Sequence, residues 1–459
     1  MIGTLASLSL EKQRKLIPAG SLRARFALGA FWSVLGAVIS RGFLLAGSIV
    51  CARFLSKAGF GALGMIQSSV GMFGVLAGLG LGFTATKYIG QYRHTDRAKA
   101  GRILALSTTA ALVSGFFMAV ALILFSGYLS KTVLGAPELA KPLAVAAGLV
   151  FFGALNGAQT GALAGLEAFK TMARINIWAG VLSFPLIVVG VWRGGLTGAV
   201  WGLIAALAVN SFLNNRALRS ECSRMELSYV FASWHQELPI LHQFSLPALL
   251  ASIIVGVAMW TCNALLVRQP DGYPQLGLYT AADKWRLLIL FVPTSVCSVA
   301  LPVLSNMYGV GDSSGFRKVF RVNVLLNSGI AFVAALVIAA FAMPIMSMYG
   351  APFRAGWPIL IIVSFTAVPE ALNTILGQPL VAGHYMWWRF AFDVLLVGVL
   401  LGSGWLLIPK WNALGLALAY GFSLSAAAFG LYVFGRTKLW VNQNHSAQMV
   451  VPNDHACEV

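Results

Sequence analysis

Long apolar stretches recur along the whole chain, and they constrain its fold more than any other feature. Each reaches about 20 residues or more, the length an α-helix needs to cross the hydrocarbon core of a bilayer. Charged residues make up only 10% of the 459 residues and hydrophobic residues 58%, whereas a soluble domain carries about 25% charged residues. Strand-like alternation typical of a membrane barrel is absent from the sequence. We therefore expect an all-α polytopic membrane protein.

The apolar stretches form two sets of six, separated by a polar connection. We expect about twelve transmembrane helices in two six-helix bundles, at roughly 27–52, 60–88, 103–128, 142–166, 172–192, 196–214, 244–268, 276–307, 322–347, 355–383, 387–408 and 412–435. The chain then divides into an N-terminal segment 1–26, an N-lobe 27–214, a linker 215–243, a C-lobe 244–435 and a tail 436–459.

Lys and Arg residues are unevenly distributed between the two sets of loops. Of the 32, 21 lie in the N-terminal segment, the tail and alternate loops, whereas 8 lie in the opposite loops. Because cytoplasmic loops carry the excess of Lys and Arg, both termini and the linker are predicted to be cytoplasmic. The net charge of +18 is therefore a topology signal. Nucleic-acid binding is not expected, since the basic residues lie in short loops and not in a basic domain.

The second half of the chain repeats short sequences of the first half in the same order. The pairs are GFGALGM at 59–65 with GYPQLGL at 272–278, LGAP at 134–137 with YGAP at 349–352, and ALN at 154–156 with ALN at 371–373. The offset between the members of a pair increases slightly from the first pair to the third, as small insertions would produce. A parallel repeat of this kind predicts a substrate site between the lobes, near the membrane midplane.

Four glycines, Gly153, Gly157, Gly161 and Gly165, recur at every fourth position of one expected span. This spacing places them on nearly one face of a helix, although each costs about 1 kcal/mol relative to alanine. Such a face permits close helix packing within a lobe or in a dimer, and we favour the lobe. In the repeat, Glu370 stands where the first half has Gly153. The two lobes are therefore expected to share a scaffold but not a chemistry.

The chain resembles a known transporter family in three stretches and in its two six-span lobes. The stretches are ARFLSKAGFGALGM at 52–65, KYIGQYRHTDRAKAGR at 87–102 and FSLPALL at 244–250. They resemble the Wzx-type O-antigen flippases, the polysaccharide transporter branch of the multidrug/oligosaccharidyl-lipid/polysaccharide flippase superfamily. The resemblance implies a MATE-like fold whose central cavity is lined by spans one, two, seven and eight.

The same resemblance implies a function, a location and partners. A polyprenyl-pyrophosphate-linked oligosaccharide would move from the cytoplasmic to the periplasmic leaflet of the bacterial inner membrane by alternating access. The product would feed O-antigen, exopolysaccharide or capsule biosynthesis. Beyond this lipid-linked oligosaccharide and membrane lipids, the candidate partners are a polysaccharide polymerase and chain-length proteins.

Charges inside the spans are the candidate substrate-binding residues, because a charge near the bilayer centre costs about 2.5–3.5 kcal/mol. Arg41 lies deep in the first span and could attract a pyrophosphate, or bond to backbone carbonyls or to an acid of another span. Asp283 and Arg286 are three residues apart and could pair with each other, while Lys284 points about 100° away. Trp285 could stack on a sugar. Together these charges give the cavity-lining spans a net charge of +2.

Glu370 and Asp393 are the remaining acids within the spans. They are coupling candidates that could take up a proton, or counter-ions for Arg389 or for the cations of span eight; we favour the structural role. No cofactor is expected, while coupling to H⁺ or Na⁺ stays open. The five cysteines and six histidines show no metal-ligand spacing, so no metal is expected either.

Two other functions are compatible with a polytopic helical chain. The first is a MATE-like ion-coupled drug or metabolite antiporter, which typically has a carboxylate in its N-lobe. The first six expected spans contain no Asp or Glu within their interiors, and this absence favours the flippase. The second is a membrane enzyme such as a polymerase. No Walker motif or hydrolytic constellation is present, and the outward loops are short, so we expect a transporter and not an enzyme.

Overall fold

The computed structural model describes residues 22–228, 246–297, 313–382 and 386–436, and these ranges are nearly all helical, with no strand among them. The N-lobe helices are α2 (Leu22–Gly78), α3 (Leu81–Tyr92), α4 (Arg97–Tyr128), α5 (Ala140–Val145), α6 (Ala147–Gly165) and α7 (Phe169–Arg224). The C-lobe helices are α9 (Leu246–Val267), α10 (Gly272–Ile289), α12 (Ser313–Ala340), α13 (Ala342–Met348), α14 (Trp357–Ala382) and α15 (Met386–Phe434). The all-α class expected from the sequence is confirmed.

Eight helical stretches of the described chain are long and apolar enough to cross a membrane. Three of them run for 48 to 56 residues, about twice the length that one crossing needs. The first covers parts of α2 and α3, the second is α7, and the third lies in α15. Each contains a residue with a left-handed backbone that interrupts the helix, namely Ser56 (φ 65°), Gly195 (φ 53°) and Asn412 (φ 47°). The count of twelve spans stays a prediction, because α10 carries three charged residues and is not among the eight.

The outer surface of both bundles carries many large apolar side chains. Phe116, Leu124, Leu325, Trp405 and Phe429 are each more than half exposed. Contiguous apolar surface of this extent is unfavourable in water and matches the interior of a bilayer. The exposed apolar surface therefore agrees with a multi-pass membrane protein.

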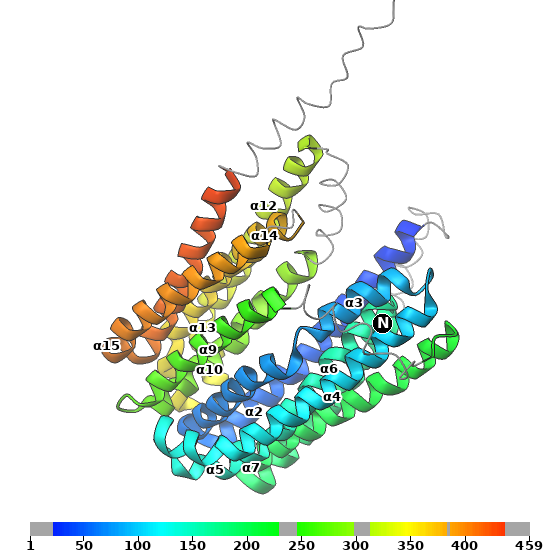
Figure 1. The fold of residues 1–459 in the computed structure, drawn as a ribbon. Helices are drawn as coiled ribbons and strands as arrows, with labels where there is room; N and C mark the ends of the chain where they lie inside the picture. The colour runs from blue at the N-terminus through cyan, green and yellow to red at the C-terminus, as the bar shows by residue number, and fades with distance from the viewer. Residues whose placement is uncertain (1–21, 229–245, 298–312, 383–385, 437–459) are drawn as a thin grey trace, which may run out of the picture.

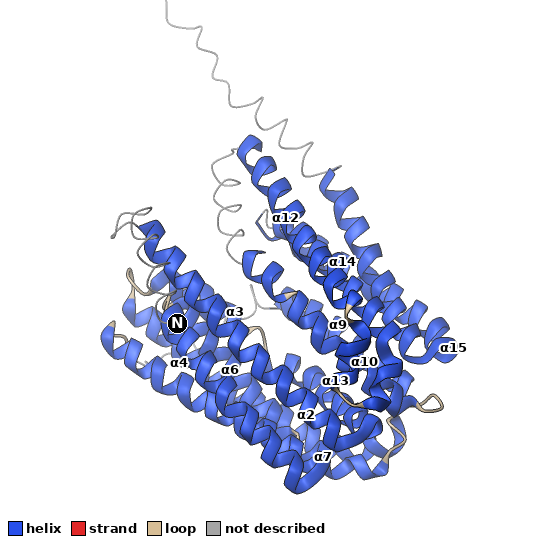
Figure 2. Cartoon of the chain, turned by 180° about the vertical axis from the view of Figure 1, so that it is seen from behind, coloured by secondary structure: helices blue, strands red, loops and turns tan. Residues whose placement is uncertain are grey.

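The two bundles meet at one end and separate toward the other. Figures 1 and 2 show them close together near α5 and α10 and apart near α3 and α12. Contacts between the lobes are made chiefly by α2 with α9 and α10. The largest cluster of buried apolar side chains draws on both lobes, for example where the Phe60 ring packs 6.1 Å from Tyr349. Clusters around Ile89 and around Ile375 each belong to a single lobe.

The internal repeat is visible in the backbone of the two lobes. Residues with a left-handed backbone recur in pairs, Ser56 with Asp271, Gly135 with Gly350, and Gly195 with Asn412, at offsets of 215, 215 and 217 residues, within the 213 to 217 of the short sequence matches. A positive φ is uncommon outside glycine, so three pairs at matching positions are a specific structural signature. The two lobes are therefore related by the parallel pseudo-repeat that the short sequence matches predicted.

The repeated ALN sequence has the same structural role in both lobes. Asn156 donates a hydrogen bond from Nδ2 to the Leu207 carbonyl at 3.4 Å. Asn373 donates from Nδ2 to the Leu424 carbonyl at 2.7 Å. The donors and the acceptors of the two bonds are separated by the same offset along the chain. In each lobe, this asparagine ties one long helix to the next.

The four regularly spaced glycines of α6, which we call the glycine ladder, bring that helix against α3 within the N-lobe. A Cβ at Gly161 would overlap the backbone of Gly82, and a Cβ at Gly165 would lie 2.9 Å from the Ala85 carbonyl oxygen. A Cβ at Gly153, at the other end of the ladder, would have no neighbouring atom within 4 Å. The close packing that we favoured within one lobe is present, and it is confined to one half of the ladder.

The loops expected on one side of the membrane contact one another at the end where the lobes separate. Arg93 pairs with Glu167 at 2.6 Å, and Arg97 pairs with Glu226 at 2.5 Å. α7 continues as helix to Arg224, beyond the N-lobe boundary expected at 214. Most of the expected linker, and nearly all of the N-terminal segment and tail, lie outside the described residues. The division into lobes, linker and termini stays a prediction.

Candidate functional site

α10 lies at the contact between the lobes, and its charged residues divide between two faces. Lys284 and Leu287 are three residues apart and share the side that contacts α2 of the N-lobe. Asp283 and Arg286 share another side, which contacts α14 and α15 of the C-lobe. The structure therefore separates Lys284 from the Asp283–Arg286 pair, as the rotation of about 100° per residue predicts.

Two partly buried cations lie where α10 faces the N-lobe, Lys284 from α10 itself and Arg41 from α2. Lys284 Nζ donates to Gln67 Oε1 at 3.0 Å. Arg41 Nη1 donates to the Leu287 carbonyl at 3.1 Å, and its guanidinium carbon lies 4.3 Å from the centre of the Phe291 ring. Within the described ranges, neither cation forms an ion pair with a carboxylate. Each lobe therefore contributes one cation that has no ion-pair partner at the contact.

Polar residues next to Gln67 continue the contact between the lobes. Asn263 Nδ2 donates to Ser68 Oγ at 2.9 Å, and Trp260 Nε1 donates to Ser69 Oγ at 2.9 Å. Three successive residues of α2 thus accept a hydrogen bond from the C-lobe. Such bonds between membrane helices contribute about 0.6 kcal/mol each on average, so this seam can open without a large cost.

The other side of α10 holds a buried cluster of one arginine and two carboxylates, with a net charge of −1. Arg286 is 7% exposed and pairs with Asp283 at 2.7 Å. It also pairs closely with Glu370 of α14, and Tyr420 Oη lies 3.4 Å from its Nη1. The net charge of +2 expected for the cavity-lining spans is unchanged, because Glu370 belongs to another span. When Glu370 is included, the charge around α10 sums to +1.

The remaining site candidates are also engaged within the C-lobe. Asp393 pairs with Arg389 at 3.2 Å, and Arg389 donates to the Asn373 carbonyl at 3.0 Å. Both coupling candidates, Glu370 and Asp393, thus have an arginine partner. Trp285 is partly buried and packs against the apolar cluster shared by the lobes.

Two arginines close the end where the lobes meet, and we call their hydrogen bonds the reciprocal latches. Arg53 Nε of the N-lobe donates to the Met348 carbonyl of the C-lobe at 2.8 Å. Arg268 Nε of the C-lobe donates to the Val133 carbonyl of the N-lobe at 2.7 Å. The two donors, and likewise the two acceptors, are separated by the same offset along the chain. Neither latch was expected from the sequence, although the repeat contained the signal, because LGAP and YGAP directly follow the two acceptors.

The same end is held by Tyr273, which precedes the span expected at 276–307. Its Oη donates to the Leu134 carbonyl at 3.2 Å. Burial, and to a lesser degree the charge of Glu138, raise the pKa of Tyr273 to about 12, so its hydroxyl keeps the donated proton at neutral pH. Close by, a Cβ at Gly61 would overlap the Tyr273 carbonyl. Only glycine allows the two lobes to approach this closely.

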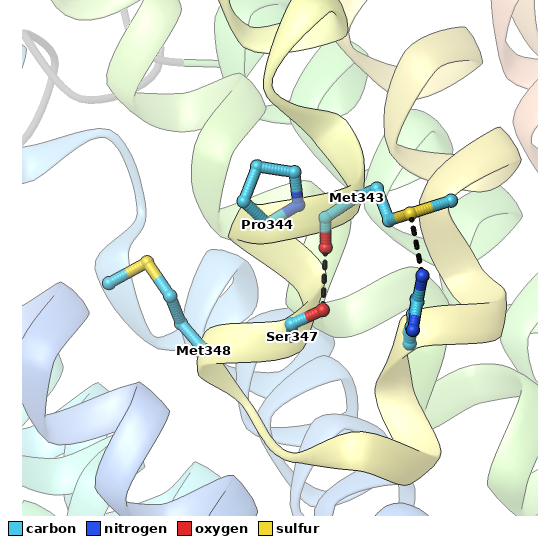
Figure 3. A pocket seen from close by; sticks show the side chains of 5 residues that line it. Met343, Pro344, Ser347 and Met348 are labelled. Carbon is cyan, nitrogen blue, oxygen red and sulfur yellow. Dashed lines mark hydrogen bonds between the residues drawn. The ribbon is translucent and has the colours of Figure 1, made fainter.

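A pocket of about 520 Å³ lies on the C-lobe hairpin that receives Arg53. Figure 3 shows Met343, Pro344, Ser347 and Met348 around it, with Ser347 Oγ donating to the Met343 carbonyl at 2.8 Å. Among the described lining residues only Arg354 is charged, and it contacts Met343 Sδ at 3.2 Å. The pocket adjoins the hydrogen bond from Arg53 to Met348, but its described lining residues all belong to the C-lobe and include none of the candidate site residues, so we do not assign the pocket to substrate.

Known proteins are similar to this chain along most of its length. Residues 26–308, more than half of the chain, match the polysaccharide biosynthesis protein family. The chain is 24% identical over 413 residues to the EPS I polysaccharide export inner membrane protein EpsE of Ralstonia solanacearum, covering 88% of this chain and 91% of that protein. It is 27% identical over 435 residues to the lipid III flippase of Escherichia coli, covering 88% and 98%.

Solved transporter structures share the fold. An inward-facing MATE-family multidrug resistance transporter of the MOP superfamily superposes with a TM-score of 0.74 at 15% identity, covering 91% of this chain and 99% of that chain. An outward-facing MATE-family transporter superposes with a TM-score of 0.70 at 14% identity, covering 91% and 96%. The chain therefore belongs to the polysaccharide biosynthesis protein family and has the fold of the MATE transporters of the MOP superfamily.

Proposed function

We propose that the protein is a flippase that moves a polyprenyl-pyrophosphate-linked oligosaccharide from the cytoplasmic to the periplasmic leaflet of the bacterial inner membrane. Family membership and the names of the similar proteins, a polysaccharide export protein and a lipid III flippase, support a transporter for surface polysaccharide biosynthesis. A polysaccharide polymerase and chain-length proteins are the proposed protein partners, because they would use the translocated lipid.

The pair Arg41 and Lys284 carries this proposal. A charge within a membrane span costs about 2.5–3.5 kcal/mol, so such charges normally pair or serve a function. Arg286 forms ion pairs with both Asp283 and Glu370, whereas the hydrogen-bond partners of Arg41 and Lys284 in the described chain are neutral. One cation comes from each lobe: Lys284 belongs to α10, and Arg41 of α2 contacts α10. A pyrophosphate between the lobes would supply the anion that these two cations lack.

Alternating access explains why the contact between the lobes is confined to one end. The reciprocal latches and Tyr273 hold that end closed, and we propose that it is periplasmic because its loops hold few Lys and Arg. The open end, with both termini, is then cytoplasmic. Cysteine labelling is expected to place 93–99 and 216–224 inside and 131–141 outside.

Ion-coupled antiport is the alternative, and the shared fold with MATE transporters is compatible with it. A carboxylate that takes up H⁺ or Na⁺ must exchange its present partner. Glu370 is held by Arg286 and Asp393 by Arg389, so coupling at either position requires an arginine to move. We retain Glu370 and Asp393 as coupling candidates for the flippase as well, with no cofactor assigned.

The proposed function is tested by polysaccharide export in cells that depend on this protein. Arg41→Ala is expected to lower surface polysaccharide at least about tenfold, because one charge-assisted contact is worth about 1.5–3 kcal/mol, and Arg41→Glu to abolish it. Arg354→Glu makes the same charge change in the C-lobe pocket and is expected to leave export normal. Immunoblots must show equal protein amounts. Normal export with Arg41→Glu would contradict the cationic site.

A further inference from the structure

A second basic site lies on the N-lobe, at the end where the lobes separate. A pocket of about 750 Å³ is formed between the first turns of α7 and its last turns. Its lining includes Lys170 and Arg174 from the first arm and Arg216 and Arg224 from the second. All four side chains are exposed, and none of them takes part in the contact between the lobes.

The acids of this pocket already have partners. Glu167 pairs with Arg93 at 2.6 Å, and Glu221 accepts a hydrogen bond from Thr171 at 2.9 Å and pairs with Arg224 at 3.5 Å. This leaves three further lining cations, which form no ion pair with a carboxylate of the described chain. These are Lys170, Arg174 and Arg216. The pocket therefore has an excess of positive charge that an anion can use.

Aromatic residues next to the pocket indicate what kind of anion fits. Trp178 follows Arg174 by four residues on the first arm of α7, and it lines the pocket while 60% exposed. Phe212 precedes Arg216 by four residues on the second arm and is 64% exposed. Because the two arms are antiparallel, both rings lie about one turn from their cation in the same direction, into the membrane. Exposed Trp at such a position is typical of the lipid interface.

We propose that this pocket binds the phosphate of an anionic membrane phospholipid, with Lys170, Arg174 and Arg216 around the headgroup and the acyl chains along Trp178. Basic pockets between transmembrane helices on the cytoplasmic side suit anionic headgroups, and each Lys or Arg near the surface contributes about 1 kcal/mol. A free phosphate would use the cations but not the rings. The proposal rests on the membrane position of α7 and does not depend on the transported substrate.

Native mass spectrometry of the full-length protein from nanodiscs tests the site, with phosphatidylglycerol and phosphatidylcholine in equal amounts as the probes. The wild-type protein is expected to retain phosphatidylglycerol preferentially. The triple variant Lys170→Gln, Arg174→Gln, Arg216→Gln is expected to lose this preference about tenfold or more. Lys131→Gln, Lys141→Gln, Arg193→Gln removes three exposed charges from the opposite end of the same lobe and is expected to retain it.

Further experiments distinguish a phospholipid from free phosphate and from the transported lipid as the source of the bound phosphate. Arg41→Gln with Lys284→Gln is expected to keep the phosphatidylglycerol preference, so the result is independent of the proposed transport site. Inorganic phosphate at millimolar concentration is expected not to displace the lipid. Equal retention of phosphatidylglycerol by wild type and the pocket triple variant would overturn the proposal. The proposal would also be overturned if the triple variant kept its preference for phosphatidylglycerol but no longer bound added undecaprenyl pyrophosphate, since the pocket would then bind the transported lipid.

Discussion

α6 of the N-lobe and α14 of the C-lobe are equivalent helices with different contacts. α6 packs through bare backbone, because Gly161 lies directly against Gly82. At the position equivalent to Gly161, α14 has Gln378, which donates to the Cys297 carbonyl at 2.9 Å and accepts from Asn323 at 3.1 Å. Glu370, the counterpart of Gly153, pairs with Arg286.

The difference shows which parts of a duplicated fold can diverge. Three features recur in both lobes: the hydrogen bonds of the ALN asparagines, the left-handed backbone positions and the reciprocal latches. The asparagine bonds join helices within a lobe, and the latches join the two lobes. The residues that differ set the charge beside α10. The N-lobe thus contributes a close-packed scaffold and Arg41, and the C-lobe contributes the charge cluster.

The largest expected effect comes from breaking the backbone contact of the N-lobe. Gly161→Leu must push α6 away from α3, and overpacking of this kind costs about 1–3 kcal/mol or more. We expect a lowered thermal unfolding temperature and a much lower yield of monodisperse protein in size-exclusion chromatography. Gly153→Leu is the matched control, since a Cβ there meets no atom within 4 Å. Equal behaviour of the two variants would show that the ladder does not bear on packing.

A smaller loss of stability is expected when Glu370 is neutralised. Glu370 is the C-lobe counterpart of Gly153 and pairs with Arg286. Glu370→Gln leaves the buried Arg286 with Asp283 alone, and removing a charged hydrogen-bond partner costs about 1–3 kcal/mol. The thermal unfolding temperature is expected to fall, and Arg286→Gln added to Glu370→Gln is expected to restore part of it. If Glu370→Gln unfolded at the wild-type temperature but abolished transport, coupling would be its role instead.

The smallest effects are expected at the reciprocal latches. They test the likeness of the two lobes, because removing the arginine of either lobe is expected to have a similar effect. Arg53→Gln removes one exposed charged hydrogen bond across the contact, and Arg268→Gln removes two, because Arg268 also donates to the Thr132 carbonyl. We expect each to shift the lobes toward separation at that end by about fivefold, from roughly 1 kcal/mol. Spin labels across the contact would measure the distance distribution. A shift with only one of the two variants would contradict their equivalence.

Local patterns in the sequence predicted the contacts that depend on spacing along one helix. The pairing of Asp283 with Arg286 and the separate direction of Lys284 follow from helical periodicity, and the two-lobe fold follows from the spans and the repeat. The partner of Arg286 on α14 could not be chosen in advance, because Glu370 lies far along the chain and its place depends on how the helices pack. From the sequence, Glu370 could be either a coupling carboxylate or a counter-ion for a cation of span eight.

The latches were missed for a different reason. Arg53 and Arg268 lie near the ends of expected spans, where a cation is ordinarily explained by membrane topology. Their acceptors are backbone carbonyls, which any residue type provides, so no side-chain pattern indicates them. Only the equal offset of the two donors and of the two acceptors marks the pair.

The central claim is that Arg41 and Lys284 together hold the anionic group of the transported lipid. The most direct measurement is the flipping rate of a fluorescent polyprenyl-pyrophosphate oligosaccharide in proteoliposomes. Arg41→Glu with Lys284→Glu is expected to slow flipping at least about 100-fold, as two charged contacts become repulsive. Arg193→Glu with Lys410→Glu reverses two exposed, repeat-equivalent cations and should leave the rate within about twofold of wild type. Wild-type flipping by the Arg41→Glu, Lys284→Glu protein would contradict the account.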